Sequence, residues 1–224
     1  YAPEHMKKET STTRLNQLNV FSLDRLNTPT NFESGLNATL GFDYELNKNK
    51  QKLKFSAAQV VNEKENKNMP SSSSLDEKLS DLVASTNFKI NDKVSFDYNF
   101  ALDQNYNDLN YNEIGTNLNF SPFKISINYL DERKHIGSQQ YIQNKLEFAK
   151  GNNGLFTFEN KRNLITNSSE YYNLSYEYIN DCLRAGLVYR REFYNDSELE
   201  ADNSLMFKIT LIPFGNLNSP SFNK

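Results

Sequence analysis

The chain of 224 residues has no tryptophan, a single cysteine (Cys182) and a formal net charge of only -3. It also lacks any apolar run near the roughly 18 residues that a membrane-spanning helix needs, which excludes a helical membrane protein. The small net charge gives no reason to expect a nucleic-acid partner. One cysteine cannot form an internal disulfide. Composition does not separate a soluble β-protein from a membrane β-barrel, because a polar barrel interior keeps mean hydropathy low.

Strict alternation of apolar and polar residues dominates the sequence from Leu36 onward, which indicates strands with two different faces. Many runs approach the roughly ten residues that cross a bilayer at the tilt of a barrel strand, whereas soluble strands average about five or six. We count about eleven strands between Phe32 and the C-terminus. The runs are Leu36 to Leu46, Leu53 to Ala57, Leu82 to Ile90, Val94 to Leu102, Ile114 to Phe120, Phe123 to Tyr129, Ile142 to Phe148, Phe156 to Asn160, Tyr172 to Tyr178, Leu183 to Phe193, and Leu205 to Leu211.

The connections between these runs alternate between short turns and longer loops. The longest loop, from Asn62 to Ser80, contains Pro70 and four consecutive serines, and we expect a helical turn at Leu75 to Leu82. Short turns on the periplasmic side and long loops outside are typical of outer-membrane barrels. Because short turns and long loops alternate in this order, the final strand leaves the C-terminus in the periplasm. The short turns are Asn47 to Lys50, Asn91 to Lys93, Ser121 and Pro122, Gly151 to Gly154, and Ile179 to Asp181.

The predicted fold is all-β, an antiparallel transmembrane β-barrel segment that forms the C-terminal half of a larger outer-membrane barrel. Closed single-chain bacterial barrels have even strand numbers, so an odd count points to a miscount or to strands missing upstream of Tyr1. The first ten residues have no apolar core and do not resemble a signal peptide. The expected organisation is an irregular extracellular lead-in at 1–31, barrel strands at 32–215, and a periplasmic tail at 216–224.

Alternation also predicts which charged side chains face a wet interior. Both signs occur, so cross-strand pairs such as Glu45 with Lys52 or Lys54 are expected. The alternative is that these charges line an ordinary water-exposed sheet face. The predicted inward set is Asp43, Glu45, Lys52, Lys54, Lys89, Asp97, Glu113, Lys124, Lys145, Glu147, Glu159, Lys161, Glu177, Arg184 and Lys208.

No combination of residues predicts catalysis, a metal site or a cofactor. The only histidines, His5 and His135, lie in irregular segments and are expected to be solvated loop residues. The serine run Ser71 to Ser74 lacks the strand-turn-helix context of a nucleophile elbow. Acidic loop residues could bind divalent cations, but solvated loops are the favoured interpretation. These residues are Asp131, Glu132, Asp196, Glu198, Glu200 and Asp202.

Two segments of the chain resemble the LPS-assembly protein family, LptD. The segment Asn19 to Leu46 contains a Phe-Ser-Leu-x-Arg motif at Phe21 to Arg25, which leads into Glu-Ser-Gly at Glu33 to Gly35. The segment Asn180 to Gly215 has a cysteine in a turn, then a Tyr-Arg-Arg segment with a following aromatic residue at Tyr189 to Phe193. A short acidic loop and a final strand ending in an apolar residue and glycine complete it. Between these segments the resemblance is one of strand rhythm.

The resemblance implies a barrel of about two dozen strands, behind a periplasmic jellyroll that receives lipopolysaccharide (LPS) from a bridge protein. It further implies an LptE-like lipoprotein plug inside the barrel and lateral release of LPS, in contact with outer-membrane lipid, where the first and last strands meet. One side of that lateral gate would come from the last strand, at Leu205, Phe207, Ile209, Leu211 and Pro213.

The resemblance also implies that Cys182 forms a disulfide with a cysteine outside this chain, which the periplasm would allow. A free thiol is the alternative. Two other functions remain open at this point. One is a general outer-membrane porin, which shares every periodicity argument. The other is a soluble or cell-surface β-protein that acts as a binding module, whose outward face would be polar or packed against a second sheet.

Overall fold

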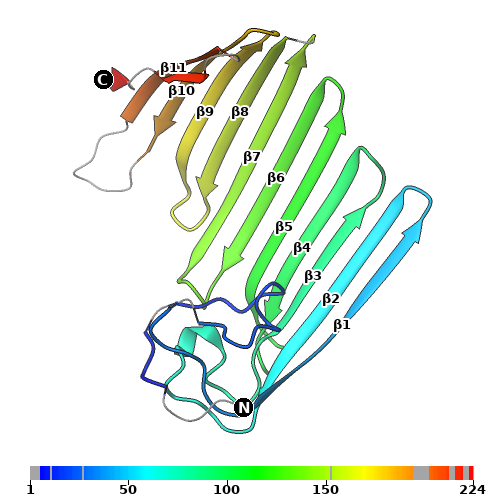
Figure 1. Ribbon diagram of the computed structural model, residues 1–224, viewed down its shortest axis with the longest axis vertical. Coiled ribbons are helices and arrows are strands. Elements are labelled where there is room, and N and C mark those ends of the chain that lie inside the picture. The colour runs from blue at the N-terminus through cyan, green and yellow to red at the C-terminus, as the bar shows by residue number, and fades with distance from the viewer. Residues whose placement is uncertain are drawn as a thin grey trace. The chain divides into compact units, whose positions relative to one another are not determined.

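The computed structural model describes residues 6–10, 12–26, 28–151, 153–193, 202–211, 215–218 and 222–223, and this part of the chain is all-β (Figure 1). Consecutive strands are hydrogen-bonded neighbours in the order β1 to β12, and the registers are antiparallel. The predicted fold class is therefore confirmed. The chain divides into two compact units, Tyr1–Gly115 with Leu130–Gln140 (unit 1) and Thr116–Tyr129 with Tyr141–Lys224 (unit 2).

Four strands lie wholly within unit 1. β1 and β2 pair along their whole lengths, from Asn37 opposite Asn62 to Lys48 opposite Gln51. Their turn places Asn49 at φ +55°, a left-handed conformation that asparagine tolerates better than most residues. The four strands are β1 (Asn37–Lys48), β2 (Gln51–Asn62), β3 (Leu82–Lys89) and β4 (Val94–Leu102).

The remaining predicted strands are also present. A bulge between Lys161 and Arg162 shifts the register of β8 against β9. Two short strands, β12 (Gly215–Asn218) and β13 (Phe222–Asn223), pair with β11 within the region expected to be the end of the barrel and its tail. The others are β5 (Leu109–Phe120), β6 (Phe123–Glu132), β7 (Gln139–Lys150), β8 (Gly154–Asn163), β9 (Ser168–Ile179), β10 (Leu183–Glu192) and β11 (Asp202–Leu211).

Large apolar side chains stay exposed along one face of the strands in each unit. On β1, Leu40 is 68% and Phe42 59% exposed, and on β8, Phe156 and Phe158 are each 40% exposed. These side chains contact one another across strands, as in Phe156 with Tyr176 of β9, whose ring centroids lie 4.4 Å apart. Exposed apolar rows of this extent mark a surface that meets a partner or lipid. They are neither polar nor packed against a second sheet, unlike the face expected of a soluble binding module.

The β2–β3 connection, residues 63–81, contains one helical turn, η1 (Ser71–Ser73). The helical turn expected at Leu75 to Leu82 is wrong, because the turn forms directly after Pro70 instead. Pro70 has φ -59°, which suits the start of a helix. The Ser73 hydroxyl donates to the Pro70 carbonyl at 2.6 Å, and Ser74 ends the turn in the left-handed conformation with φ 59°.

Candidate functional site

The registers of unit 1 place the predicted inward charges on one common face. Residues directly opposite one another share a face, and Glu45 lies opposite Lys54, while Lys52 lies opposite Lys89. The expected cross-strand pairs form, with Lys52 Nζ 3.1 Å and Lys54 Nζ 3.4 Å from Glu45 carboxylate oxygens. Asp97 belongs to the same face, because it lies opposite Asn87.

Unit 2 repeats this arrangement with its own charged residues. Lys145 lies opposite Glu159, and Glu177 and Lys208 both lie opposite Gly186. Further contacts join the same face: Arg184 pairs with Glu177, Lys145 Nζ lies 2.6 Å from Glu147 Oε1, and Lys124 lines a cavity of about 230 Å³ together with Lys145 and Glu147. Each unit therefore has a polar face opposite its exposed apolar face.

The N-terminal segment packs against the polar face of unit 1 and is part of its site. We call residues 12–26 the strap. Leu15 and Val20 of the strap are fully buried. The Gln17 side-chain amide donates to the Val83 carbonyl of β3 at 2.7 Å, and the Thr39 hydroxyl of β1 donates to the Val20 carbonyl at 3.1 Å. In Figure 1 this N-terminal part (blue) lies at the same end of unit 1 as η1.

Small residues on the polar face make room for the strap. A Cβ atom on Gly41 of β1 would lie 2.7 Å from Phe21 Cζ and 2.8 Å from Ala58 Cβ, so only glycine fits beneath Phe21. The same face also carries four buried apolar residues, namely Ala58, Val60, Val83 and Ala101. Sequence reasoning missed this contact, although the double valine Val60-Val61 interrupts the alternation and was the available signal.

Arg25, the arginine of the Phe-Ser-Leu-x-Arg motif, fixes one end of the strap. Its Nη1 lies 2.5 Å from Glu33 Oε1, and both side chains are almost fully buried. Arg25 also donates from Nε to the Val20 carbonyl at 3.0 Å and from Nη2 to the Thr39 hydroxyl at 2.8 Å. Burial raises the pKa of the Glu33 carboxyl, and the Arg25 charge partly opposes that rise. The motif arginine and the glutamate of Glu-Ser-Gly therefore form one buried ion pair.

His135 is not a solvated loop histidine, and that expectation is wrong. Its side chain is fully buried, with Nδ1 3.1 Å from Glu132 Oε1 and Nε2 2.9 Å from Asp81 Oδ2. Burial opposes a charge on this ring, but hydrogen bonds and charge from Asp81 and Glu132 outweigh burial and raise the His135 pKa. The loop sequence carried no sign of this, because Asp81 is distant along the chain.

The acidic residues of the same loop are also buried, contrary to the solvated interpretation. Glu132 is fully buried and Asp131 is 9% exposed. Arg14 of the strap reaches Glu132 with Nη2 2.7 Å from Oε2, and Asp131 pairs with Arg133 at 2.8 Å. Through Asp81, His135, Glu132 and Arg14, the strap is tied to the residue before β3, to the end of β6 and to the β6–β7 loop. We call these four residues the His135 cluster.

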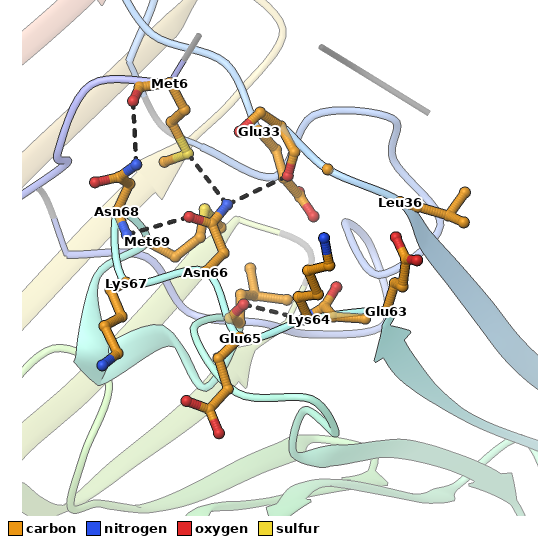
Figure 2. Close-up of a pocket in the computed structure, with 14 residues that line it drawn as sticks. Met6, Glu33, Leu36, Glu63, Lys64, Glu65, Asn66, Lys67, Asn68 and Met69 are labelled. Atoms are coloured by element: carbon orange, nitrogen blue, oxygen red, sulfur yellow. Dashed lines mark hydrogen bonds between the residues drawn. The ribbon is translucent and has the colours of Figure 1, made fainter. Parts of the chain in front are cut away.

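A cavity of about 460 Å³ lies between residues 33–36 and the first part of the β2–β3 loop. Figure 2 shows Asn66 beside this cavity. The Asn66 side-chain amide donates to Met6 Sδ at 3.6 Å and to the Ser34 carbonyl at 3.2 Å. Asn68 donates to the Met6 carbonyl at 3.2 Å. Charged residues of both signs also line the cavity, namely Glu63, Lys64, Glu65 and Lys67. These contacts join the N-terminal segment to the loop, and no residue of the predicted inward set lines this cavity.

The predicted gate residues share the exposed apolar face of unit 2. Leu205 and Phe207 are each 46% and Leu211 37% exposed, and Ile209 lies opposite Ala185 on the same face. Pro213 lies outside the described residues, as do His5, Asp196, Glu198 and Glu200, whereas Asp202 begins β11. Cys182 is exposed in the β9–β10 turn, where its amide donates to Asn180 Oδ1 at 3.0 Å.

Within the described ranges, no group of three or more His, Cys, Asp or Glu residues is placed to hold a metal ion. Nor does any helix in that part of the chain have the length and apolarity to cross a membrane.

Antiparallel strands with an exposed apolar face and a charged face, joined by alternating short turns and long loops, are typical of the class of outer-membrane β-proteins. The sequence profile of the family described as "LptD: LPS transport system D" matches residues 8–164. The chain belongs to this family, whose role is LPS transport and assembly. The matched range includes the Asn19 to Leu46 segment and ends before the Asn180 to Gly215 segment. No curated protein matches the chain in a sequence comparison.

Proposed function

We propose that this chain forms part of the wall of an outer-membrane barrel that takes LPS from a periplasmic bridge protein and releases it sideways into the outer leaflet. The observation that carries this proposal is the division of each unit into an exposed apolar face and a charged face. LPS is itself divided into acyl chains and polar sugars. A wall with both faces suits a lipid that must cross with its sugars in water and its chains in hydrocarbon.

In this mechanism the sugars pass along the charged faces, among residues such as Lys54, Asp97 and Lys145. The acyl chains leave at the edge of the last strand into membrane lipid. In this proposal the wall guides LPS passively and an upstream component supplies the energy. The proposal includes an LptE-like plug inside the barrel, a periplasmic C-terminus, and a disulfide from Cys182 to an upstream cysteine.

The edge of β11 supports its role in lateral release. β10 pairs with β11 over ten residues, whereas the other edge of β11 is paired over four residues by β12 and two by β13 in the described part of the chain. A strand paired over short stretches opens at lower cost than one paired along its whole length, because fewer backbone hydrogen bonds must break.

Photo-crosslinking in the full-length protein tests the release route. A photo-reactive residue at Leu205 or Phe207, on the apolar face, should capture LPS by its acyl chains. The matched positions Met206 and Lys208 face the other way and should capture it by its sugars, if at all. LPS captured at none of the four positions would contradict release at this strand.

Depletion of the full-length protein tests the function itself. Surface LPS should fall on depletion, and LPS should accumulate on the periplasmic side. Unchanged surface LPS would remove the assembly role and leave the porin alternative, which solute-uptake measurements on the same cells would then examine.

A further inference from the structure

The two arginines of the Tyr-Arg-Arg segment point to opposite faces of β10. Arg190 lies on the charged face, where its Nε is 2.5 Å from Glu192 Oε1. Arg191 is exposed and lies opposite Tyr172 of β9 and Asn203 of β11, on the face that carries the apolar rows of unit 2. Charged side chains are uncommon on the lipid-facing side of a membrane strand. Arg191 therefore lies outside the proposed path of the sugars along the charged face.

Arg191 belongs to a row of polar residues that crosses β7 to β11 on the apolar face. Each member of the row lies directly opposite the next one in the antiparallel registers, and the members are Asn144, Asn160, Tyr172, Arg191 and Asn203. One step closer to the short turns, the same registers form a row of four apolar residues and one tyrosine. These are Leu146, Phe158, Leu174, Tyr189 and Leu205. The polar row therefore borders the apolar rows on the side of the β8–β9 and β10–β11 loops.

The position of this row fits the outer border of a membrane. Strand β11 rises about 27 Å from Leu211 to Asn203 at about 3.4 Å per residue. At a tilt of about 40° the strand crosses about 20 Å, which is close to the roughly 25 Å height of the apolar band of an outer-membrane barrel. The row lies at the end of the strands away from the short turns, which is the outer side in the proposed function. Arginine is tolerated at such a border and strongly disfavoured at the bilayer midplane.

Charge on the apolar face of unit 2 is of one sign. Within residues 141–150, 154–163, 168–179, 183–192 and 202–211, no Asp or Glu lies on this face, whereas Lys150, Arg162 and Arg191 do. Lys150 is at the short-turn end, and the two arginines are at the loop end. Arg162 donates from Nη2 to Asn167 Oδ1 at 2.5 Å. The uncompensated positive charge at the loop end is complementary to an anionic group of a lipid.

Aromatic side chains orient Arg191 and leave its N–H groups available. Its guanidinium carbon lies 4.9 Å from the Phe193 ring centroid, and Phe193 meets Tyr172 edge to face at 5.6 Å. Beside it, the Tyr189 hydroxyl donates to Asn203 Oδ1 at 3.0 Å. A guanidinium stacked on a ring is already oriented, and its planar fork can donate two parallel hydrogen bonds to a phosphate. Tyrosine is also a residue typical of the level of lipid headgroups.

We propose that Arg191, with Tyr172 and Asn203 beside it, binds a phosphate of lipid A, the lipid part of LPS, in the outer leaflet next to β11. The inference rests on the proposed function, which sets the outer side and the lipid that leaves along β11. Lipid A carries its phosphates where its acyl chains meet its sugars, and this is the level of the polar row. One strand separates β8 from β10, so Arg162 and Arg191 originate about 10 Å apart across the strands. Two such cations suit lipid A with two phosphates better than a phospholipid with one.

Photo-crosslinking of the full-length protein in vesicles tests the site. A photo-reactive residue at Leu174, which is 52% exposed on the apolar face next to the polar row, reports which lipid lies there. Vesicles of phosphatidylethanolamine receive equal amounts of intact LPS, LPS without its lipid A phosphates, or phosphatidylglycerol. Intact LPS should give several-fold more adduct than the other two. Equal capture of dephosphorylated LPS would overturn phosphate recognition, and equal capture of phosphatidylglycerol would overturn the assignment to lipid A.

Variants of the two adjacent arginines assign the effect to one face. Arg191→Gln should reduce the adduct with intact LPS to the level seen with dephosphorylated LPS. Arg191→Lys should restore part of it, because the charge returns without the paired donors. Arg190→Gln removes the same charge from the other face and should leave the adduct unchanged. An unchanged adduct in Arg191→Gln, or an equal loss in Arg190→Gln, would contradict the site. Arg191 is exposed, so gel mobility of the folded protein should be the same in its variants as in the parent.

The site and the proposed function fail in different ways. LPS is already in the membrane of these vesicles, so capture at Leu174 does not depend on delivery by the protein. Unchanged surface LPS on depletion, with preferential capture of intact LPS preserved, would remove the assembly role and leave the phosphate site. Surface LPS that depends on the protein, with capture that does not depend on Arg191, would remove the site alone.

Discussion

Arg25 and Glu33 form a buried ion pair, with Nη1 2.5 Å from Oε1, that joins the two motifs of the N-terminal family segment. Arg25 closes the strap, and Glu33 lies shortly before β1, where Asn37 also donates to its Oε1 at 3.1 Å. The pair therefore sets where the irregular segment ends and the first strand begins. All of these partners lie within 14 residues of Arg25, so the ion pair is a local contact and does not join distant parts of the chain.

Removal of one partner of this pair should be strongly destabilising. Arg25→Gln or Glu33→Gln leaves the other charge or its hydrogen bonds uncompensated, and we expect a loss of about 3–5 kcal/mol for Arg25→Gln, typical of a broken buried ion pair. Glu33→Gln keeps an acceptor for Arg25 and should cost less. Urea unfolding of the folded protein in detergent measures both. The exposed pair Glu45–Lys52 is the control, and Glu45→Gln should leave the transition unchanged. Equal effects of the substitutions at positions 25 and 45 would contradict a stabilising role for the buried Arg25–Glu33 ion pair.

Gly41 should not tolerate a side chain. Gly41→Val would place its Cβ 2.7 Å from Phe21 Cζ and 2.8 Å from the Ala57 carbonyl oxygen. Overpacking of this kind typically costs about 1–3 kcal/mol, and a backbone atom cannot move aside as a side chain can. The matched control is Gly186→Val in β10, whose Cβ would meet only the Tyr176 carbonyl oxygen at 4.0 Å. Thermal unfolding followed by gel mobility compares the two, and an equally stable Gly41→Val protein would show that the strap does not lie on β1.

Charge on the two faces of β8 should have opposite consequences. Phe156 is exposed on the apolar face, and the adjacent Thr157 points to the polar face opposite Ser175. If the apolar face meets lipid, Phe156→Lys should cost about 2–4 kcal/mol at the bilayer midplane and less near its surfaces. Thr157→Lys should fold as well as the parent. The yield of folded protein in the outer membrane measures both, and equal yields would argue against lipid contact at this face.

The unfolding free energy should depend on pH through His135. The two carboxylates raise the His135 pKa in the folded protein above its usual value. Its contribution to stability is therefore complete below the usual value and is lost as pH rises through the raised one. Urea unfolding at several pH values should show this loss in the parent, while His135→Gln should be less stable and flat over the same window. A parent that gains stability as pH rises through that window would contradict the assigned charge state.

Cys182 offers a simple test of its predicted disulfide. The thiol is exposed in a turn that lies on the expected periplasmic side. In the full-length protein, a bond to an upstream cysteine should change mobility on a non-reducing gel, and Cys182→Ser should abolish that change. Identical mobility of the parent and the variant would leave Cys182 as a free thiol.

The strands could be predicted from the sequence because each of their faces has a uniform environment. In β1, apolar and polar residues alternate from Leu40 to Leu46. This period of two matches the alternation of side chains along an extended chain, so it is enough to predict the strand. β2 extends beyond its predicted run, because the apolar Val60 is buried on the charged face and Val61 is exposed on the other, so two apolar residues follow one another and interrupt the alternation. The inward charges could be assigned to a common face for the same reason, since registers preserve parity.

The buried polar contacts could not be predicted, because they depend on residues far apart in the chain. His135 meets Asp81 across 54 positions, and neither residue has a local pattern that distinguishes it from a solvated loop residue. The strap has no periodicity to reveal that Leu15 and Val20 are buried. Arg25 and Glu33 are close in sequence, but opposite charges eight positions apart are common, and only the fold makes them a buried pair.

The register shift between Lys161 and Arg162 has a practical consequence for anyone who alters the β8–β9 loop. Simple counting back from Tyr172 would point Glu170 to the apolar side, yet Glu170 Oε2 lies 2.7 Å from Lys161 Nζ, whose side chain belongs to the charged side. One additional residue on β9 turns that carboxylate around. An epitope or label inserted at 164–167 should therefore be phased from Asn163, which lies opposite Ser168, and not from Tyr171, because counting across the additional residue assigns Ser168 and Ser169 to the wrong face.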